Sequence, residues 1–224
     1  MQERYPLFLS DGIVTMPDAL FAMERAAVAH SIDLHIDHDR MLRNFGALWM
    51  LARCTVHFQK LPVAPVRLET VLRPPTAAVS CRDFTFYDGE TPVGTAVQTW
   101  VLADAGTRSM LRLNGLEVLS KLPFALPPRT SLPPRVRLPE DMTAAATWQI
   151  VPEEIDANGH LNNVQYLRRS APLVSAGANA LNICFERECF AGEALTLLTA
   201  PGGYVCGKKA DGSESFRLRL WREE

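Results

Sequence analysis

The chain has 224 residues, of which 47% are hydrophobic and 21% charged, a composition that excludes disordered and fibrous proteins. Its 23 basic and 25 acidic residues leave a formal charge of −2, so no overall field attracts nucleic acid or an anionic membrane. The longest apolar stretches fall far short of the roughly 20 residues that span a bilayer.

The N-terminal residues and the cysteines indicate the cellular compartment in which the protein is expected. Glu3, Arg4 and Pro6 interrupt the region where a secretory signal needs a basic start and an apolar run. The five cysteines form no C-x-x-C pair and have no histidine at metal-ligand spacing. We therefore expect a cytoplasmic protein with free thiols, without a membrane span or a nucleic acid partner.

The first half of the chain predicts one long helix followed by strands. The run Thr15-Met16-Pro17-Asp18 is a typical helix start, and the apolar residues after it predict a helix over about 17–30. Five segments have strand character, near 48–60, 64–73, 77–88, 92–103 and 107–113, and turn signals separate them.

A proline-rich stretch divides the chain, because six of its 16 prolines lie between positions 123 and 139. It predicts a linker over 119–144, between a first unit at 1–118 and a second at 145–224. The second unit repeats the order of the first, with a strand near 146–151, a polar turn, a helix over about 161–171 and strands near 181–190, 193–200, 203–209 and 214–222. The expected fold class is α+β, with two tandem repeats, each a curved antiparallel sheet wrapped around a central helix.

The densest polar run is Asp156-Ala157-Asn158-Gly159-His160-Leu161-Asn162-Asn163, at a predicted strand-to-helix junction. Residues of these types dominate turns and helix caps, which is the simpler interpretation on composition alone. However, an aspartate and a histidine four residues apart can meet across a turn, and histidine titrates near neutral pH. Two adjacent asparagines also exceed the needs of one cap, so a catalytic role stays open.

A second candidate is the run Glu186-Arg187-Glu188-Cys189, expected on the strand near 181–190. Strand alternation places Glu188 and Cys189 on opposite faces unless a bulge intervenes. A glutamate can act as a general base for water, and a cysteine as a nucleophile, although Cys189 is more simply a small buried core residue.

Other sites have weaker support. His30, His35 and His38 lie among aspartates at spacings that match no metal site, so a solvated loop is expected there. The chain has no G-x-S-x-G, P-loop or Rossmann pattern in the appropriate setting. We expect no metal and no organic cofactor.

The run D-A-N-G-H-L-N-N-V-Q-Y, followed by F-E-R-E-C, resembles the acyl-acyl carrier protein thioesterases, a double-hotdog family. Trp49 in G-A-L-W-M-L-A-R-C-T-V-H-F and Trp100 in Q-T-W-V-L-A-D-A-G-T-R resemble that family's first hotdog repeat, so the similarity covers most of the chain. The resemblance implies hydrolysis of the thioester between a fatty acyl chain and the phosphopantetheine arm of acyl carrier protein (ACP), in fatty acid biosynthesis.

The resemblance also assigns roles. Asp156, Asn158 and His160 fall on the family's D-x-N-x-H motif, and Glu188 and Cys189 on its downstream E-C pair. It implies Glu188 as the base or water-positioning residue, Asn158 and His160 as groups that hold or polarise the carbonyl, and Asp156 as their orienting partner. Cys189 as nucleophile is the minor alternative. Further substrate contacts are expected from Asn162, Asn163 and Trp49.

Several alternatives remain open. The same features suit an acyl-CoA thioesterase of the hotdog superfamily or a non-catalytic acyl-binding module.

The candidates for lining an acyl tunnel are Phe21, Met23, Trp49 and Met50, although ordinary core is the simpler interpretation. The acidic carrier needs a basic docking surface, for which Arg168-Arg169 and the cations of the linker (Lys121, Arg129, Arg135, Arg137) are candidates. Pro172 and Gly177 predict that the second helix ends early. Two repeats in one chain make a monomer sufficient, and a homodimer stays open.

Overall fold

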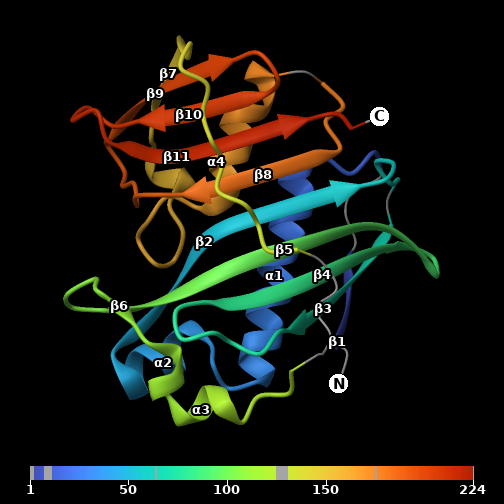
Figure 1. Cartoon of the computed structure of the whole chain (residues 1–224), viewed down its shortest axis with the longest axis vertical. Coiled ribbons are helices and arrows are strands. Elements are labelled where there is room, and N and C mark those ends of the chain that lie inside the picture. Colours follow the sequence, from blue (N-terminus) through green and yellow to red (C-terminus); the bar gives the residue numbers. More distant parts are fainter. Residues whose placement is uncertain (1–2, 8–11, 64, 125–130, 175, 224) are drawn as a thin grey trace.

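The structure is a computed structural model that describes residues 3–7, 12–63, 65–124, 131–174 and 176–223. Within these ranges eleven strands form one sheet, in the order β1-β3-β4-β5-β2-β8-β11-β10-β9-β7, with β6 paired to β5 (Figure 1). The strands are β1 (Glu3–Leu7), β2 (Ala47–Phe58), β3 (Val66–Leu72), β4 (Ser80–Asp88), β5 (Thr91–Asp104), β6 (Met110–Leu111), β7 (Thr143–Gln149), β8 (Ala180–Phe185), β9 (Ala194–Ala200), β10 (Tyr204–Lys208) and β11 (Glu214–Trp221). The helices are α1 (Met16–Asp33), α2 (His38–Phe45), α3 (Glu117–Ser120) and α4 (Asn163–Ser170), with 3₁₀ turns at Leu113–Gly115, Pro152–Glu154 and Ala171–Leu173.

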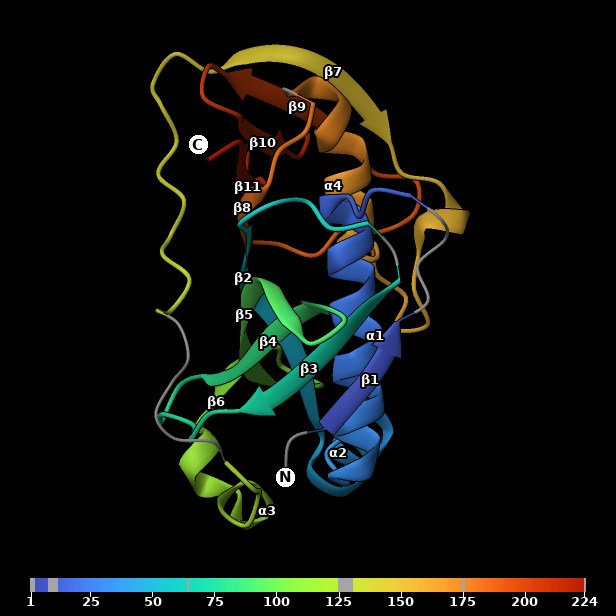
Figure 2. The ribbon, with the colours of Figure 1, turned by 90° about the vertical axis from the view of Figure 1, so that its right-hand side faces the viewer.

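Two helix-wrapped sheets join edge to edge through β2 and β8, which pair antiparallel from Arg53 opposite Cys184 to His57 opposite Ala180. Both central helices, α1 and α4, lie on the same face of the combined sheet (Figure 2). The first sheet curves around α1, and its outer strands β3 and β1 cross in front of that helix in Figure 2. The expected α+β fold of two tandem sheet-and-helix repeats is confirmed.

The local sequence explains α1. The Asp18 carboxylate accepts a hydrogen bond from the Thr15 backbone at 3.0 Å, and the Thr15 hydroxyl accepts one from the Asp18 backbone at 3.4 Å, which forms a capping box. Ala19, Ala22 and Ala26 are buried and let the helix approach the sheet closely. The helix predicted over 17–30 is confirmed, and it continues to Asp33.

The core lies between the two helices and the sheet. It contains buried side chains of both halves in one cluster, among them Met23 and Phe58 from the first and Tyr166 and Phe216 from the second. Phe58 and Phe86 contact each other with ring centroids 4.8 Å apart. Met23 is fully buried, as the core interpretation predicted, whereas Phe21 is 40% exposed.

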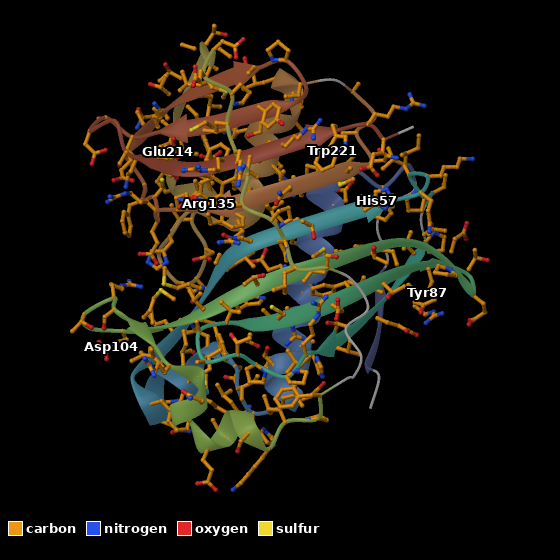
Figure 3. All side chains as sticks on the ribbon, viewed as in Figure 1. His57, Tyr87, Asp104, Arg135, Glu214 and Trp221 are labelled. Atoms are coloured by element: carbon orange, nitrogen blue, oxygen red, sulfur yellow. The ribbon has the colours of Figure 1, made fainter. Side chains whose placement is uncertain are left out.

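Two predictions in the first half are wrong. The strand expected at 107–113 is limited to Met110–Leu111, because the hairpin before it is folded around Asp104, whose carboxylate accepts hydrogen bonds from the backbone of Gly106 and Thr107. This hairpin extends beyond the end of β5, where Asp104 is labelled in Figure 3. The loop expected around the three histidines is wrong for His30, which lies buried within α1, and for His38, which begins α2, whereas His35 does lie in an exposed turn between the two helices.

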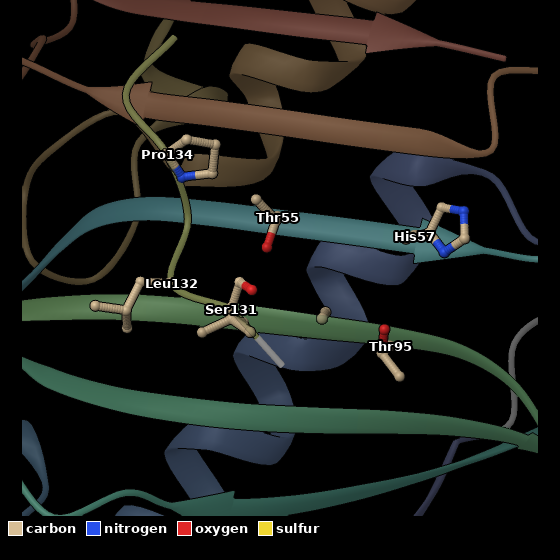
Figure 4. A pocket seen from close by; sticks show the side chains of 8 residues that line it. Thr55, His57, Thr95, Ser131, Leu132 and Pro134 are labelled. Atoms are coloured by element: carbon tan, nitrogen blue, oxygen red, sulfur yellow. The ribbon is translucent and has the colours of Figure 1, made fainter. Parts of the chain in front are cut away.

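The proline-rich segment 131–142 crosses the outer face of the sheet, opposite the helices (Figure 2). The side chains of Arg53 and Asn182 donate hydrogen bonds to the carbonyls of Pro133 and Pro134, and Val136 is buried. A cavity of about 210 Å³ lies between this segment and β2 and β5, with Thr55 and Thr95 in its wall (Figure 4). The division at 118 and 145 stays a prediction, and Arg129 lies outside the described residues.

Candidate active site

The turn that carries the polar run lies between a 3₁₀ turn and α4. The Asp156 carboxylate accepts hydrogen bonds from the backbone of Asn158 at 2.8 Å and of His160 at 3.4 Å, and from the Asn158 side chain at 3.4 Å. Gly159 has a φ of +82°, a left-handed conformation that side chains disfavour. Asp156 therefore fixes the positions of both residues that follow it in the motif.

The segment 186–189 is a loop and not the continued strand that was predicted, since β8 ends at Phe185. The backbone N–H groups of Glu186 and Arg187 both donate to the Ser215 carbonyl, at 2.8 and 3.0 Å. Two consecutive residues thus oppose one, as in a β-bulge, and the alternation of side chains is interrupted. Beyond this point Glu188 lies in the wall of a pocket, and Cys189 lies in the core.

The loop and the polar turn meet directly. The Leu161 N–H donates to the Cys189 carbonyl at 2.8 Å, and Lys209 donates to the Glu188 carbonyl at 2.9 Å. As a result His160 Nε2 lies 3.6 Å from Glu188 Oε1, and both side chains are largely shielded from solvent. The structure therefore brings together two of the residues that the sequence singled out 28 positions apart.

Arg108 completes this group from the other half of the chain, and sequence reasoning missed it. Its guanidinium donates to Glu188 Oε1 at 3.2 Å and lies 3.4 Å from His160 Nε2. Arg108 has a φ of +58°, rare for a residue with a side chain, and sits in the Asp104 hairpin. The left-handed conformation of Arg108 is visible only in the structure, and no pattern in the sequence pointed to this residue.

Cys189 is fully buried, and its thiol lies 2.9 Å from the Ser215 hydroxyl. Burial raises the pKa of this thiol above its ordinary value, although hydrogen bonds with Ser215 and Tyr166 act in the opposite direction. Cys189 is not among the residues that line the pocket described next. A buried thiol with a raised pKa has the properties of a core residue and not of an activated nucleophile.

The pocket has a volume of about 610 Å³. One end is polar and contains the motif residues Asp156, Asn158 and His160 together with Glu188 and Arg108. From there the pocket extends along α1 and across β2, β5 and β4, where many of its lining side chains are apolar: Ile32, Ile36, Leu48, Trp49, Met50, Leu51, Leu72, Trp100. The polar residues of this part of the lining are Ser31, Asp37, His38, Asp39, Ser80 and Arg82. A polar end joined to a long apolar channel suits a chain with one reactive group.

The remaining predicted contacts separate into two groups. Trp49 and Asn163 line the pocket, and the Trp49 indole donates to the Ile36 carbonyl at 3.0 Å. Asn162 instead caps α4, since its side chain accepts from the Val164 backbone at 2.8 Å. Its amide nitrogen donates to Glu24 of α1 at 3.2 Å.

Glu24 is a second contribution from the first half that the sequence did not indicate, and it lines the polar end of the pocket. Burial raises the pKa of this carboxyl; the hydrogen bond from Asn162 opposes the shift, and the negative charge of Asp156 adds to it. Within the described ranges no cluster of histidine, cysteine and acidic residues is arranged to hold a metal ion. No helix in the same ranges is long and apolar enough to cross a membrane.

Comparison with known proteins agrees with this architecture. The model of the acyl-ACP thioesterase N-terminal domain matches residues 9–119, about half of the chain. An acyl-ACP thioesterase from Bacteroides thetaiotaomicron has the same fold, with a TM-score of 0.87 and 19% identity over 99% of this chain and 98% of that one. The 12:0-ACP thioesterase from Umbellularia californica gives a TM-score of 0.79 and 17% identity over 99% and 96% of the two chains. A search of curated protein sequences gave no match. With the double-hotdog fold shared over 99% of the chain and the family model matched in its first half, the chain belongs to the acyl-ACP thioesterase family, which hydrolyses acyl-ACP thioesters.

Proposed function

We propose that this acyl-ACP thioesterase cleaves its substrate by direct attack of water, with Glu188 as the general base. The observation that carries the proposal is the convergence of Glu188, His160 and Arg108 at a polar end of a pocket that also has a long apolar wall. The pocket accepts the acyl chain, and its polar end holds the thioester. Cys189 lies outside this arrangement, which favours water over the thiol as the nucleophile.

The reaction balances with these groups alone. Glu188 takes a proton from water as the oxygen attacks the thioester carbonyl, which forms a tetrahedral intermediate with a negative oxygen. Donors from Asn158, His160 and Arg108 face this end of the pocket and stabilise that charge. The carbon–sulfur bond then breaks, and the thiolate of the phosphopantetheine arm leaves and takes up the proton that Glu188 received from water, which regenerates the carboxylate. The products are a free fatty acid and the carrier thiol.

Asp156 is a positioning group in this scheme, and Arg108 has a positioning role in addition to its interaction with the developing charge. Asp156 holds the backbone of Asn158 and His160 through the hydrogen bonds given above. Arg108 fixes the Glu188 carboxylate next to His160 and compensates its charge within a partly desolvated pocket. The second repeat therefore supplies the motif, and the first repeat supplies the cation that orders it.

We also propose a basic docking surface for the acidic carrier around Arg168. This side chain is exposed directly after the motif, on α4. Its neighbour Arg169 is engaged instead with the Glu154 carboxylate, at 2.5 Å. Arg135 of the proline-rich segment similarly pairs with Glu186 at 3.3 Å. Substitution of Arg168 therefore tests docking more directly than substitution of Arg169 or Arg135, which would also break an ion pair.

The experiment is fatty acid release from ACP thioesters of graded chain length, with the same acyl groups on coenzyme A, by wild type and Glu188→Gln. The proposal expects faster hydrolysis of the ACP esters and a loss of about 100-fold or more in kcat in the variant. Activity on coenzyme A esters alone would favour the acyl-CoA thioesterase. Tight binding without cleavage would favour the acyl-binding module.

A further inference from the structure

We infer that Glu24 binds the leaving group of the substrate, by accepting a hydrogen bond from the amide N–H that follows the sulfur of the phosphopantetheine arm. The inference rests on the proposed function, since it takes the polar end of the pocket to hold the thioester. It adds a residue of the first repeat that recognises the arm, and with it a preference for thiols that carry an amide two carbons from the sulfur.

Glu24 is the lining residue of α1 that lies nearest to the catalytic turn. The residues of α1 in the pocket wall share one face of the helix: Glu24, Ala27, Val28, Ser31, Ile32. Figure 2 shows α4 beside the N-terminal part of α1, and α2 at the other end of that helix. The pocket continues past Ile32 to Ile36, directly before α2. An acyl chain in it therefore runs away from Glu24, and the arm leaves the thioester on the Glu24 side.

A hydrogen bond connects Glu24 to the turn that carries the motif. The Asn162 side-chain nitrogen lies 3.2 Å from Glu24 Oε1 and 3.4 Å from Oε2. Asn162 comes two residues after His160, and two residues span at most about 7 Å. In the arm, two methylene groups separate the sulfur from the amide nitrogen, a distance of roughly 4 Å. A thioester next to His160 therefore brings its amide N–H within reach of the Glu24 carboxyl.

The Glu24 carboxyl can accept further hydrogen bonds. A carboxylate offers about four lone-pair sites, and among the described residues Asn162 is the donor that reaches this one. Glu188 and Glu154 differ, since each faces an arginine, at 3.2 and 2.5 Å respectively. No cation of the described residues is paired with Glu24. Burial raises the pKa of its carboxyl, the Asn162 hydrogen bond lowers it and the Asp156 charge raises it again.

These surroundings favour a neutral N–H donor on the substrate. A carboxyl keeps an acceptor oxygen whether it is ionised or protonated, so the hydrogen bond does not depend on the charge of Glu24. The acyl chain has no donor to offer, whereas the arm has an amide N–H next to the thioester. An acceptor in a partly desolvated pocket gains most from a ligand that supplies its missing donor.

A purely structural role for Glu24 is the competing explanation, because it joins α1 to the residue that caps α4. The two explanations make different predictions for ligand binding. Loss of a structural contact weakens the binding of all ligands alike. Loss of an amide acceptor weakens only the binding of ligands that carry the N–H.

The test uses two thioethers that cannot be hydrolysed at sulfur, S-decyl-N-acetylcysteamine and 2-(decylthio)ethyl acetate, in which one N–H is replaced by oxygen. By calorimetry we expect wild type to bind the N–H compound about tenfold more tightly. In Glu24→Met the two Kd values should become equal, and Glu24→Gln should keep part of the difference, because its amide oxygen still accepts. Arg25→Met is the matched control and should leave the ratio unchanged, since Arg25 is the next residue of α1 but is exposed and lies outside the pocket wall.

Kinetics with dodecanoyl-ACP provide a second readout. Because the hydrogen bond is made before and during the reaction alike, Glu24→Met should raise KM about tenfold and keep kcat within about threefold. A variant that lost its fold would lose kcat as well, and the Tm of each variant checks for this.

The outcomes separate this inference from the proposed function. Equal Kd values for the two compounds in wild type, or no binding of either, overturn the inference, and cleavage of dodecanoyl-ACP by the same protein leaves the proposed function intact. A ratio that persists in Glu24→Met, or an equal loss of affinity for both compounds in Glu24→Gln, also overturns it. Wild type that prefers the N–H compound but cleaves no acyl-ACP counts against the proposed function alone.

Discussion

Replacing Cys189 by alanine tests whether its thiol attacks the thioester or only fills the core. The thiol is fully buried, lies 2.9 Å from the Ser215 hydroxyl and has a pKa raised by burial. A nucleophilic thiol needs the opposite conditions, namely access to the substrate and a lowered pKa. We therefore expect Cys189→Ala to keep kcat within about threefold of wild type, while Glu188→Gln loses about 10² to 10⁴ of it.

The same substitution should change stability. It removes one fully buried sulfur atom and its contact with Ser215, for which the expected loss is about 1–2 kcal/mol of unfolding free energy. In a chain of this length, that corresponds to a fall in Tm of about 3–6 °C. A conservative variant, Cys189→Ser, leaves a hydroxyl in the core and tests the same site with a weaker nucleophile.

The assay measures fatty acid release from acyl-ACP at saturating substrate, with Tm recorded for each variant. Mass spectrometry of wild type mixed with substrate adds a direct readout, because a thiol nucleophile forms an acyl-enzyme and attack by water does not. A folded Cys189→Ala protein with kcat reduced 100-fold, or an acyl group found on Cys189, would refute the reasoning. Alkylation by iodoacetamide under native conditions should likewise leave this buried thiol unmodified.

Three further predictions concern charges. Arg108→Ala should lower kcat for acyl-ACP about tenfold or more with little change in KM, and Arg108→Lys should restore part of it; an unchanged kcat in Arg108→Ala contradicts the positioning role. Arg168→Glu should raise KM for acyl-ACP and not for small thioesters, and an equal effect on both removes the docking proposal. His30→Gln should flatten the pH dependence of stability in urea unfolding. The folded pKa of about 4 lies below the ordinary 6.5, so wild type is fully stabilised above pH 6.5 and loses up to about 3 kcal/mol as the pH falls to 4; parallel curves for the two proteins contradict this.

The sequence predicted those features of the fold and the site that depend on neighbouring residues alone. The capping threonine and early proline locate the start of α1, and period-two alternation locates β11 between Glu214 and Trp221. The motif at Asp156–His160 is contiguous, and its turn is built from its own side chains. These features need no information from distant parts of the chain.

The features that the sequence missed depend on distant contacts. The end of β8 is set by the Ser215 carbonyl, which accepts from two consecutive N–H groups and belongs to a strand that comes 30 residues later. Arg108 contacts Glu188 across 80 positions, and nothing in either segment alone indicates the other. The buried pair of His30 and Arg82 similarly joins a helix to a strand, which is why the histidine was expected in a loop.

The absence of a second catalytic motif does not leave the first repeat without a role in the reaction. Pairing of β2 with β8 fixes the two sheets edge to edge, and this pairing determines where the Asp104 hairpin meets the catalytic loop. Through it the first repeat places Arg108 on Glu188 and Glu24 on Asn162, and it supplies the apolar walls of the pocket. Catalysis in the second repeat therefore depends on the register of the β2–β8 junction, and a substitution that shifts this register would impair chemistry and chain binding together.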